Sequence, residues 1–268
     1  MGLLPLNLPS SPPLWKEARL GLEAAALARD PVYWGEGIEY GQNQPVLLIP
    51  GFLAGDGTLA VLTHWLRRSG HHTSKAGMRL NAGCSGRQVE HLEERLERLV
   101  DRTGKPAVLI GQSRGGSHAK VLACRRPDLV SGIITLGSPT LGPFSVHPLV
   151  RMQVVAVGAL GSLGAPGLFS RDCLSGRCCS EFWELHDGPL PDGVGFVSIY
   201  SRSDGIVDWH ACLDSAAERY VEVDSSHIGM GLNAQVYRAI AGALADFRAR
   251  GEEGLPEAAP AQPLRKAA

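Results

Sequence analysis

Ser113 is the residue of this sequence whose surroundings most clearly predict chemistry, because it lies in the pentapeptide Gly-Gln-Ser-Arg-Gly. An apolar, β-prone run at 107–110 precedes it and a helix-favouring run at 117–124 follows it, so the chain must turn sharply at the serine. Glycines two positions before and two positions after the serine relieve the crowding of such a turn and leave the hydroxyl exposed. An ordinary glycine-rich turn is the alternative, but the place between strand and helix favours a nucleophile.

A serine hydroxyl is a poor nucleophile at neutral pH, so this hypothesis requires a histidine base that a carboxylate holds in one tautomer. Catalytic groups of open parallel sheets gather beyond the C-terminal ends of the strands. His227 closely follows a predicted strand at 220–223, whereas the other histidines lie mainly in helical or loop patterns. We therefore predict that His227 is the base.

Two aspartates follow the predicted strand at 196–200 and compete for the role of the acid. Asp204 comes first and precedes Gly205, where a tight turn can aim a carboxylate back across the strand ends. Asp208 lies a turn later and can instead cap or pair locally. We favour Asp204 as the acid, and Asp208 remains the alternative.

A further pair of groups is needed to stabilise the negative charge that develops on a carbonyl oxygen. Gly51 and Phe52 come just past a predicted buried strand at 46–49, so the backbone N–H of Phe52 can face the same region as the N–H of Arg114. Two such donors, aimed at an oxyanion, each contribute on the order of 10² to 10³ in rate. We predict an oxyanion hole at Phe52 and Arg114, with a plain turn after the strand as the alternative.

These candidates depend on strands and helices that alternate along the chain. Strands are predicted at 46–49, 107–110, 133–136, 196–200 and 220–223, and helices at 14–28, 59–70, 89–99, 117–124 and 236–247. Such alternation specifies a mostly parallel sheet with helices on both faces. We expect one α/β domain over 44–250, an N-terminal helical segment (1–43) that packs on it, and a disordered tail at 251–268.

The alternation breaks between about 139 and 192, and we interpret this segment as a lid inserted between two strands. An apolar stretch within it is long enough for a helix that carries Leu149, Met152 and Val155 on one face. We expect that face to bind acyl chains together with Leu53, which follows the predicted oxyanion residue. A helix that simply belongs to the core is the alternative.

Three cysteines, Cys173, Cys178 and Cys179, cluster in the same segment. Cys173 either closes a small disulfide loop with Cys178 or Cys179, worth about 2 kcal/mol in the chain-entropy model, or the thiols stay reduced. A zinc site requires a fourth ligand, which this spacing does not supply. We therefore expect neither a metal nor another cofactor.

The motifs around these candidates occur in an order that resembles the α/β-hydrolase superfamily. They read L-L-I-P-G-F, G-Q-S-R-G-G, I-Y-S-R-S-D-G-I-V-D and S-S-H-I-G-M, and the resemblance spans residues 44–248. Within the superfamily they are similar to bacterial lipases and esterases, including those related to inositol-deacylase-like lipases. The resemblance implies an α/β-hydrolase fold with a lid insertion, and a catalytic triad of Ser113, Asp204 and His227.

Two positions depart from the pattern of this family. Pro50 and Gly51 stand where many relatives have His-Gly, a change that should leave the backbone donor of Phe52 intact. Arg114 follows the nucleophile where relatives often carry a small or apolar residue. Its side chain either puts a cation at the pocket rim, points into solvent or pairs with Asp56.

The resemblance and the three triad residues together predict a serine hydrolase that cleaves carboxylic esters through an acyl-enzyme on Ser113. Three alternatives stay open: acyl transfer to another acceptor, cleavage of a thioester or amide by the same residues, and a catalytically silent hydrolase fold that only binds. The expected partner is a small acyl ester or a lipid-like molecule.

The overall composition argues against other classes of partner. The 268 residues carry a net charge of −1, so no global field attracts nucleic acid or an anionic membrane surface. The N-terminus lacks the basic region of a secretory signal, and the most apolar long stretch is broken by glycines and too short to span a bilayer. We expect a cytoplasmic protein that neither binds nucleic acid nor inserts stably into a membrane.

Overall fold

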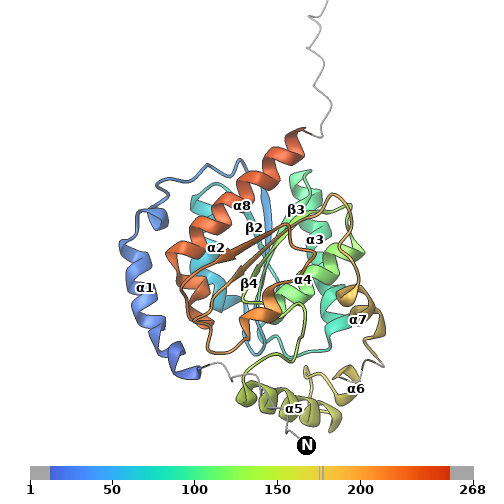
Figure 1. Ribbon diagram of the computed structural model, residues 1–268. Coiled ribbons are helices and arrows are strands. Elements are labelled where there is room, and N and C mark those ends of the chain that lie inside the picture. The colour runs from blue at the N-terminus through green and yellow to red at the C-terminus, as the bar shows by residue number, and fades with distance from the viewer. Residues whose placement is uncertain (1–12, 175, 177, 254–268) are drawn as a thin grey trace, which may run out of the picture.

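The structure of the protein is a computed structural model, and it describes residues 13–174, 176 and 178–253 (Figure 1). Within these residues, parallel strands form one sheet in the order β2-β1-β3-β4-β5-β6. The strands are β1 (Pro45–Ile49), β2 (His72–Lys75), β3 (Ala107–Gln112), β4 (Val130–Leu136), β5 (Gly195–Tyr200) and β6 (Arg219–Glu222). Every residue of β1, β3 and β5 is buried, as expected for strands that are covered on both faces.

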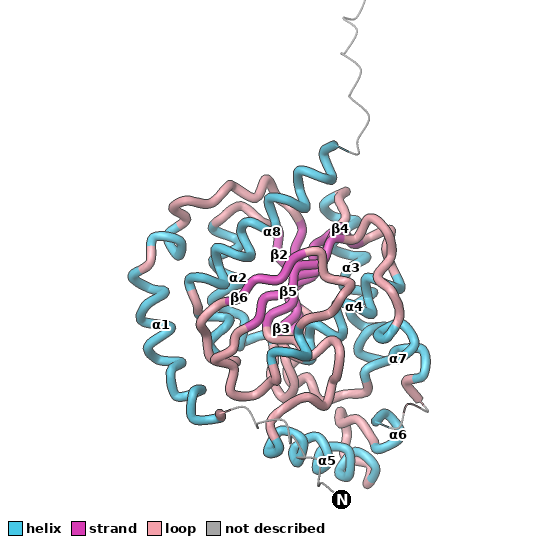
Figure 2. Tube along the Cα trace, viewed as in Figure 1, coloured by secondary structure: helices cyan, strands magenta, loops and turns pink. Residues whose placement is uncertain are grey.

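Helices cover both faces of this sheet (Figure 2). The α-helices are α1 (Leu20–Arg29), α2 (Ala60–Arg68), α3 (Ser85–Thr103), α4 (Arg114–Arg125), α5 (Pro148–Ser162), α6 (Arg171–Leu174), α7 (Ser180–Asp187) and α8 (Ala234–Glu253). The short 3₁₀ segments are η1 (Leu14–Arg19), η2 (Pro31–Trp34), η3 (Asp56–Leu59), η4 (Trp209–Cys212) and η5 (Ile228–Leu232). Side chains of α3, α4 and α7 form one buried cluster against the sheet, and those of α1, α2 and α8 form the other.

The register of the central strands determines which loops meet at the edge of the sheet. Ile49, the last residue of β1, lies opposite Gly111 in β3. The loop that contains Phe52 therefore leaves the sheet beside the turn that contains Ser113. Parallel pairing thus brings together two segments that the sequence separates by some sixty positions.

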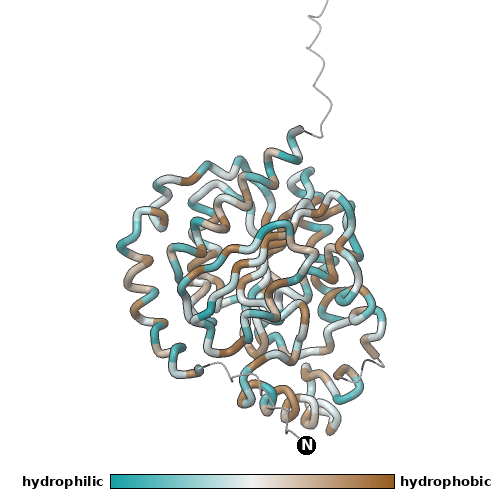
Figure 3. Tube along the Cα trace, viewed as in Figure 1, coloured by the Kyte–Doolittle hydropathy of each residue, from teal (hydrophilic) through white to brown (hydrophobic). Residues whose placement is uncertain are grey.

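The long connection between β4 and β5 carries α5, α6 and α7. Figure 1 shows α5 and α6 beyond one end of the sheet, whereas α7 packs beside α4. Hydrophobic residues are concentrated along the central strands, and α5 carries many as well (Figure 3). In the described ranges, no helix is both long and apolar enough to cross a membrane.

The predicted parallel sheet with helices on both faces is confirmed, and the structure adds one strand that the sequence did not predict. That strand is β2, a polar edge strand of sequence His-Thr-Ser-Lys, which has no apolar run to reveal it. The tail predicted at 251–268 falls mostly outside the described residues, although α8 extends to Glu253.

Candidate active site

Ser113 occupies a strained turn between β3 and α4. Its backbone has φ 52° and ψ −123°, a region that residues other than glycine rarely adopt, and its N–H donates to the carbonyl of Leu136 at 2.9 Å. The flanking glycines make the turn possible. A Cβ atom on Gly111 would lie 2.4 Å from the carbonyl oxygen of Gly115, and one on Gly115 would lie 2.3 Å from that of Ile49. The glycine spacing is therefore required by close backbone packing.

Asp204 and His227 form a buried hydrogen-bonded pair. Nδ1 of His227 donates to Oδ2 of Asp204 at 2.6 Å, and both side chains are almost completely buried. The second carboxylate oxygen of Asp204 accepts from the N–H groups of Ile206 at 2.8 Å and Val207 at 2.7 Å. These bonds satisfy both oxygens and hold the carboxylate in one orientation.

The alternative acid, Asp208, pairs locally. Its Oδ1 accepts from Nδ1 of His210 at 2.7 Å and from the N–H of the same residue at 3.1 Å, so it caps η4. Asp204 and not Asp208 is therefore the aspartate that contacts His227.

The environment of His227 shifts its basicity in two opposing directions. Burial is the largest influence and lowers the pKa, because it penalises the charged imidazolium. The charge and hydrogen bond of Asp204, assisted by the charge of Glu17, outweigh that effect, so the pKa of His227 lies above its ordinary value. A raised pKa makes the imidazole a stronger base.

His227 lies next to the turn that contains Ser113. Nε2 of the Gln112 side chain donates to the backbone carbonyl of His227 at 3.1 Å, which ties the histidine loop to the residue before the serine. Within the part of the chain that the structure describes, no hydrogen bond joins the Ser113 hydroxyl to the imidazole. Contacts between nucleophile and base are commonly long in substrate-free sites and tighten when substrate binds.

The predicted oxyanion donors lie on the loop after β1 and at the first residue of α4. A Cβ atom built on Gly51 would lie 3.2 Å from Cβ of Ser113, so the loop that carries Phe52 passes close to the serine. Neither Phe52 nor Arg114 uses its backbone N–H in a hydrogen bond to another described residue. Both donors therefore remain available to an oxygen of a bound ligand.

The side chain of Arg114 turns to the loop before α3 and does not pair with Asp56. Its guanidinium donates to the backbone carbonyl and side-chain oxygen of Asn81 at 3.2 and 3.1 Å, to the carbonyl of Gly83 at 2.8 Å and to the hydroxyl of Ser85 at 2.9 Å. Burial lowers the pKa of Arg114 to about 10, which leaves it protonated at neutral pH. Arg114 thus adds a fixed cation to one wall of the site.

An apolar pocket opens at Ser113. Its lining comes mainly from the loop after β1, the serine turn and the long connection between β4 and β5. It includes Phe52, Phe144, Val150, Val154, Phe169, Leu174, Phe182 and Trp183. A tilted contact between the rings of Phe52 and Phe169, with centroids 6.1 Å apart, joins the loop after β1 to the inserted segment. The inserted segment therefore contributes to the wall of the pocket.

The four residues predicted to bind the acyl chain do not line this pocket. Leu53, Leu149, Met152 and Val155 are 36 to 64% exposed, whereas α5 turns the side chains of Val150 and Val154 inward. The prediction chose the wrong face because α5 is apolar on most of its surface, so periodicity does not distinguish its two sides. Leu53 follows the predicted oxyanion donor Phe52 and itself has a positive φ of 56°, and its side chain stays at the surface.

Sequence reasoning also missed Glu17, a residue of η1. Its Oε1 accepts from the N–H groups of Gly205 and His227, both at 2.9 Å, and its Oε2 accepts from the N–H of Ile228 at 2.9 Å. One carboxylate therefore bridges the loop after β5 and the loop after β6. Glu23, in α1, makes a similar contact with the backbone and hydroxyl of Ser226.

Comparison with known proteins supports this description at the level of the fold. A family model described as the alpha/beta hydrolase fold matches residues 66–157, a range that includes Ser113. The monoacylglycerol lipase of Paleococcus ferrophilus superposes with a TM-score of 0.55 at 14% identity, covering 78% of this chain and 97% of that one. A metagenomic carboxyl esterase gives 0.57 at 15% identity, with 95% of this chain and 96% of that chain covered. The mature lipase of Bacillus licheniformis gives 0.57 at 13% identity, covering 76% and 92%.

The protein has the α/β-hydrolase fold: a parallel sheet flanked by helices, with a sharp serine turn after β3. The resemblance deduced from the four motifs is confirmed in this respect, and the similar structures include lipases and esterases. They do not single out the inositol-deacylase-like lipases.

Proposed function

We propose that the protein is a serine hydrolase that cleaves carboxylic esters through an acyl-enzyme on Ser113. The observation that carries the proposal is the buried 2.6 Å hydrogen bond between His227 and Asp204, next to the strained turn of Ser113. A carboxylate bonded to Nδ1 fixes the tautomer in which Nε2 carries no proton and can accept one. The fold and the lipases and esterases among its structural neighbours agree with this reading.

Acylation begins when Oγ of Ser113 attacks the ester carbonyl carbon while His227 takes the hydroxyl proton. The N–H groups of Phe52 and Arg114 stabilise the oxyanion of the tetrahedral intermediate. The carbonyl re-forms as the bond to the alcohol oxygen breaks, and the imidazolium of His227 gives its proton to the leaving alcohol. Asp204 remains ionised throughout and stabilises the imidazolium charge.

Deacylation repeats these steps with water in place of the serine. His227 removes a proton from the water, whose oxygen attacks the acyl carbon, and the same two N–H donors hold the oxyanion. The intermediate collapses to the carboxylic acid, and the proton returns through His227 to Oγ of Ser113. The active site is then ready for another ester.

The pocket supports an apolar acyl group as the recognised part of the substrate. Its wall at Ser113 is aromatic and aliphatic, with Phe52, Phe144, Val150 and Val154 among the lining residues. Each methylene group removed from water in such a pocket contributes about 0.8 kcal/mol. A lid role for the inserted segment, in the sense of opening and closing, stays part of the proposal.

Labelling with a fluorophosphonate tests this function directly. Attack of Oγ on phosphorus displaces fluoride, so an active serine hydrolase should take up one label per chain, on the peptide that contains Ser113. Hydrolysis of p-nitrophenyl butyrate should be lost in proportion to labelling. A chain that neither labels nor hydrolyses the ester would be a silent hydrolase fold, and labelling at another serine would contradict the assignment of Ser113.

Glu17 is a positioning residue in this proposal, and its charge should be visible in the pH profile. Replacement by glutamine removes a negative charge beside His227, which lowers the pKa of the imidazole because the imidazolium loses a favourable partner. The base then remains neutral at lower pH, so the acid limb of the kcat/KM profile should move to lower pH. The plateau should fall several-fold, since glutamine retains one accepting oxygen and loses the other.

The matched control is Glu36→Gln, an exposed glutamate of the same N-terminal segment that should change neither the plateau nor the limb. The measurement is kcat/KM for p-nitrophenyl butyrate at a series of pH values from about 5 to 9, an interval that includes the titration of histidine. A purely structural role of Glu17 would lower the plateau without moving the acid limb, and that result would contradict the proposed positioning role.

A further inference from the structure

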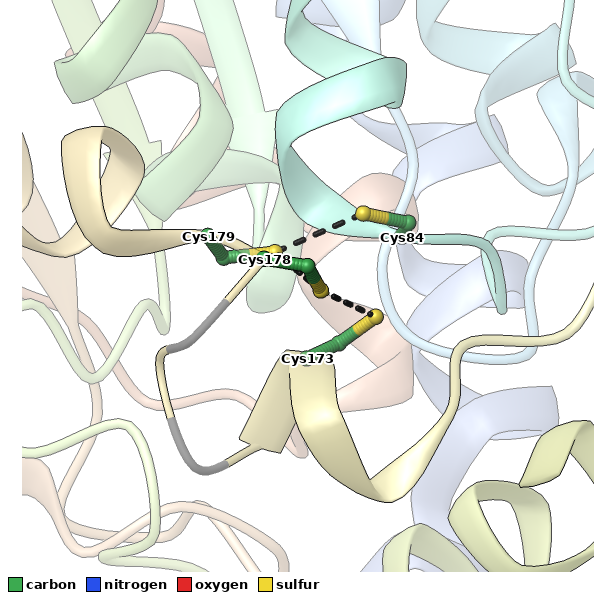
Figure 4. A group of neighbouring side chains, drawn as sticks. All are labelled: Cys84, Cys173, Cys178 and Cys179. Carbon is green, nitrogen blue, oxygen red and sulfur yellow. Dashed lines mark hydrogen bonds between the residues drawn. The ribbon is translucent and has the colours of Figure 1, made fainter.

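Four cysteine side chains meet at the wall of the pocket (Figure 4). Cys173 belongs to α6, Cys178 and Cys179 directly precede α7, and Cys84 directly precedes α3. Their sulfur atoms all lie within 4.8 Å of one another. The fold thus supplies the fourth cysteine that the local spacing of the other three lacked.

The distances between these sulfurs fit coordination of one metal ion better than disulfide bonds. Sγ of Cys84 is 3.4 Å from that of Cys179, and Sγ of Cys178 is 3.1 Å from that of Cys173 and 3.7 Å from that of Cys179. A disulfide requires about 2.05 Å, and all four cysteines are free. Four sulfurs placed at about 2.3 Å around a tetrahedral zinc ion are separated by about 3.8 Å.

Backbone N–H groups lie against two of the four sulfurs. The backbone N–H of Gly86 donates to the sulfur of Cys179, and that of Ser170 donates to Cys173. Such N–H groups commonly orient and stabilise thiolate ligands from the second shell of a metal site. Cys84 and Cys179 are in addition the N-cap residues of α3 and α7, where the helix dipole favours negative charge.

The guanidinium of Arg114 lies next to this group. Its hydrogen bonds to described residues all go to neutral oxygens, and two of these belong to Gly83 and Ser85, the residues on either side of Cys84. Among the described residues, no carboxylate forms an ion pair with Arg114. A zinc ion bound to four thiolates carries a net charge of −2 and would supply the missing counter-charge.

We propose that Cys84, Cys173, Cys178 and Cys179 bind one zinc ion as a structural tetrathiolate site. Binding replaces four S–H bonds by four Zn–S bonds and releases four protons to solvent, with no change of oxidation state. Four protein ligands leave no open coordination position, so the ion has a structural and not a catalytic role.

The ion would join the inserted segment to the core of the domain. Cys84 precedes α3, which packs against the sheet, whereas the other three ligands belong to the segment that forms the pocket wall. Cys173 itself lines the pocket, and Arg114 links the residues beside Cys84 to the serine turn. Loss of zinc should therefore loosen the wall of the pocket while the sheet stays folded.

Metal analysis and thiol counting test the site without reference to catalysis. The full chain, purified without added chelator or reductant, should contain about one zinc per chain by elemental mass spectrometry. Denaturation with a chelator should then reveal six free thiols, the whole cysteine content. Absence of metal would overturn the proposal, whether the chain then shows six free thiols or fewer because disulfides have formed. Iron in place of zinc would overturn the assignment of the ion.

Two single variants compare a ligand with a cysteine outside the group. Cys178→Ser removes the exposed member of the four, and Cys124→Ser removes a partly exposed cysteine elsewhere on the chain. Cobalt added to the metal-free protein should give the visible absorption bands of a tetrahedral thiolate complex. Cys178→Ser should weaken cobalt binding at least about 100-fold, because loss of a ligand exceeds the effect of second-shell changes.

Cys124→Ser should bind cobalt as the unmodified chain does. Equal affinity of the Cys178→Ser protein and the control would overturn the proposal. Should Cys178→Ser fail to fold, cobalt titration of the unmodified chain decides the question, because a spectrum without tetrahedral thiolate bands would overturn it equally.

Discussion

Replacement of Ser113 by alanine should remove essentially all hydrolysis of p-nitrophenyl butyrate, with a loss in kcat on the order of 10⁶. The effect is this large because no acyl-enzyme can form without the serine hydroxyl, so His227 and the oxyanion donors have no nucleophile to assist. The measurement is kcat at saturating ester, with thermal unfolding recorded for both proteins. Hydrolysis by the alanine variant within tenfold of the unmodified rate would end the proposal that Ser113 is the nucleophile.

A second substitution at the same position separates loss of chemistry from loss of structure. The φ of 52° at Ser113 strains any residue with a side chain, at a cost on the order of 1–3 kcal/mol, and glycine adopts it freely. Ser113→Gly should therefore be as inactive as the alanine variant and unfold at a higher temperature. An inactive but more stable protein would show that the strain serves the presentation of the hydroxyl.

Asp204→Asn should lower kcat about 10⁴-fold, the size of effect found when a triad aspartate becomes an amide. The amide can still accept from Ile206 and Val207, so the loop should keep its shape. On the side of His227, however, an NH₂ group in place of a carboxylate oxygen favours the wrong imidazole tautomer. The imidazolium would also lose its counter-charge.

Asp208→Asn is the matched control for this prediction. Its carboxylate contacts His210 at the start of η4 and does not contact His227, so its loss should change kcat less than tenfold. Both variants are assayed with the same ester at the pH optimum of the unmodified protein. A larger loss for Asp208→Asn than for Asp204→Asn would mean that the acid was assigned to the wrong residue.

The parts of the site that the sequence predicts are those encoded by short local patterns. The turn at Ser113 needs glycines at fixed positions, and the parallel sheet forces the ends of successive strands to one edge. Position after a strand is therefore informative, and it selected Asp204 and His227, which the structure joins. Choice of Asp204 over Asp208 rested on the nearer turn alone.

The parts that the sequence did not reveal depend on contacts between distant segments. Cys84 lies 95 positions before Cys179, and its place at the start of α3 carries no local sign of a ligand. The prediction placed the pocket on the outward face of α5 because apolar side chains occur around most of this helix. In the sequence, Glu17 is not distinguishable from other charged residues of an amphipathic segment, and only the fold brings it within hydrogen-bond distance of the N–H of His227.

The contact between Glu17 and His227 has a consequence for the order in which the molecule assembles. The two residues are 210 positions apart, and Glu17 also bonds Gly205 across 188 positions. At roughly 5–20 residues per second, a ribosome takes about 10–40 s to cover that distance. β1, β3 and β4, with the turn at Ser113, can associate during that interval, whereas Glu17 waits for both of its partners. In the proposed mechanism, the nascent chain therefore contains its nucleophile well before it can acquire a base, and it becomes competent for catalysis only as its last strand and helix are completed.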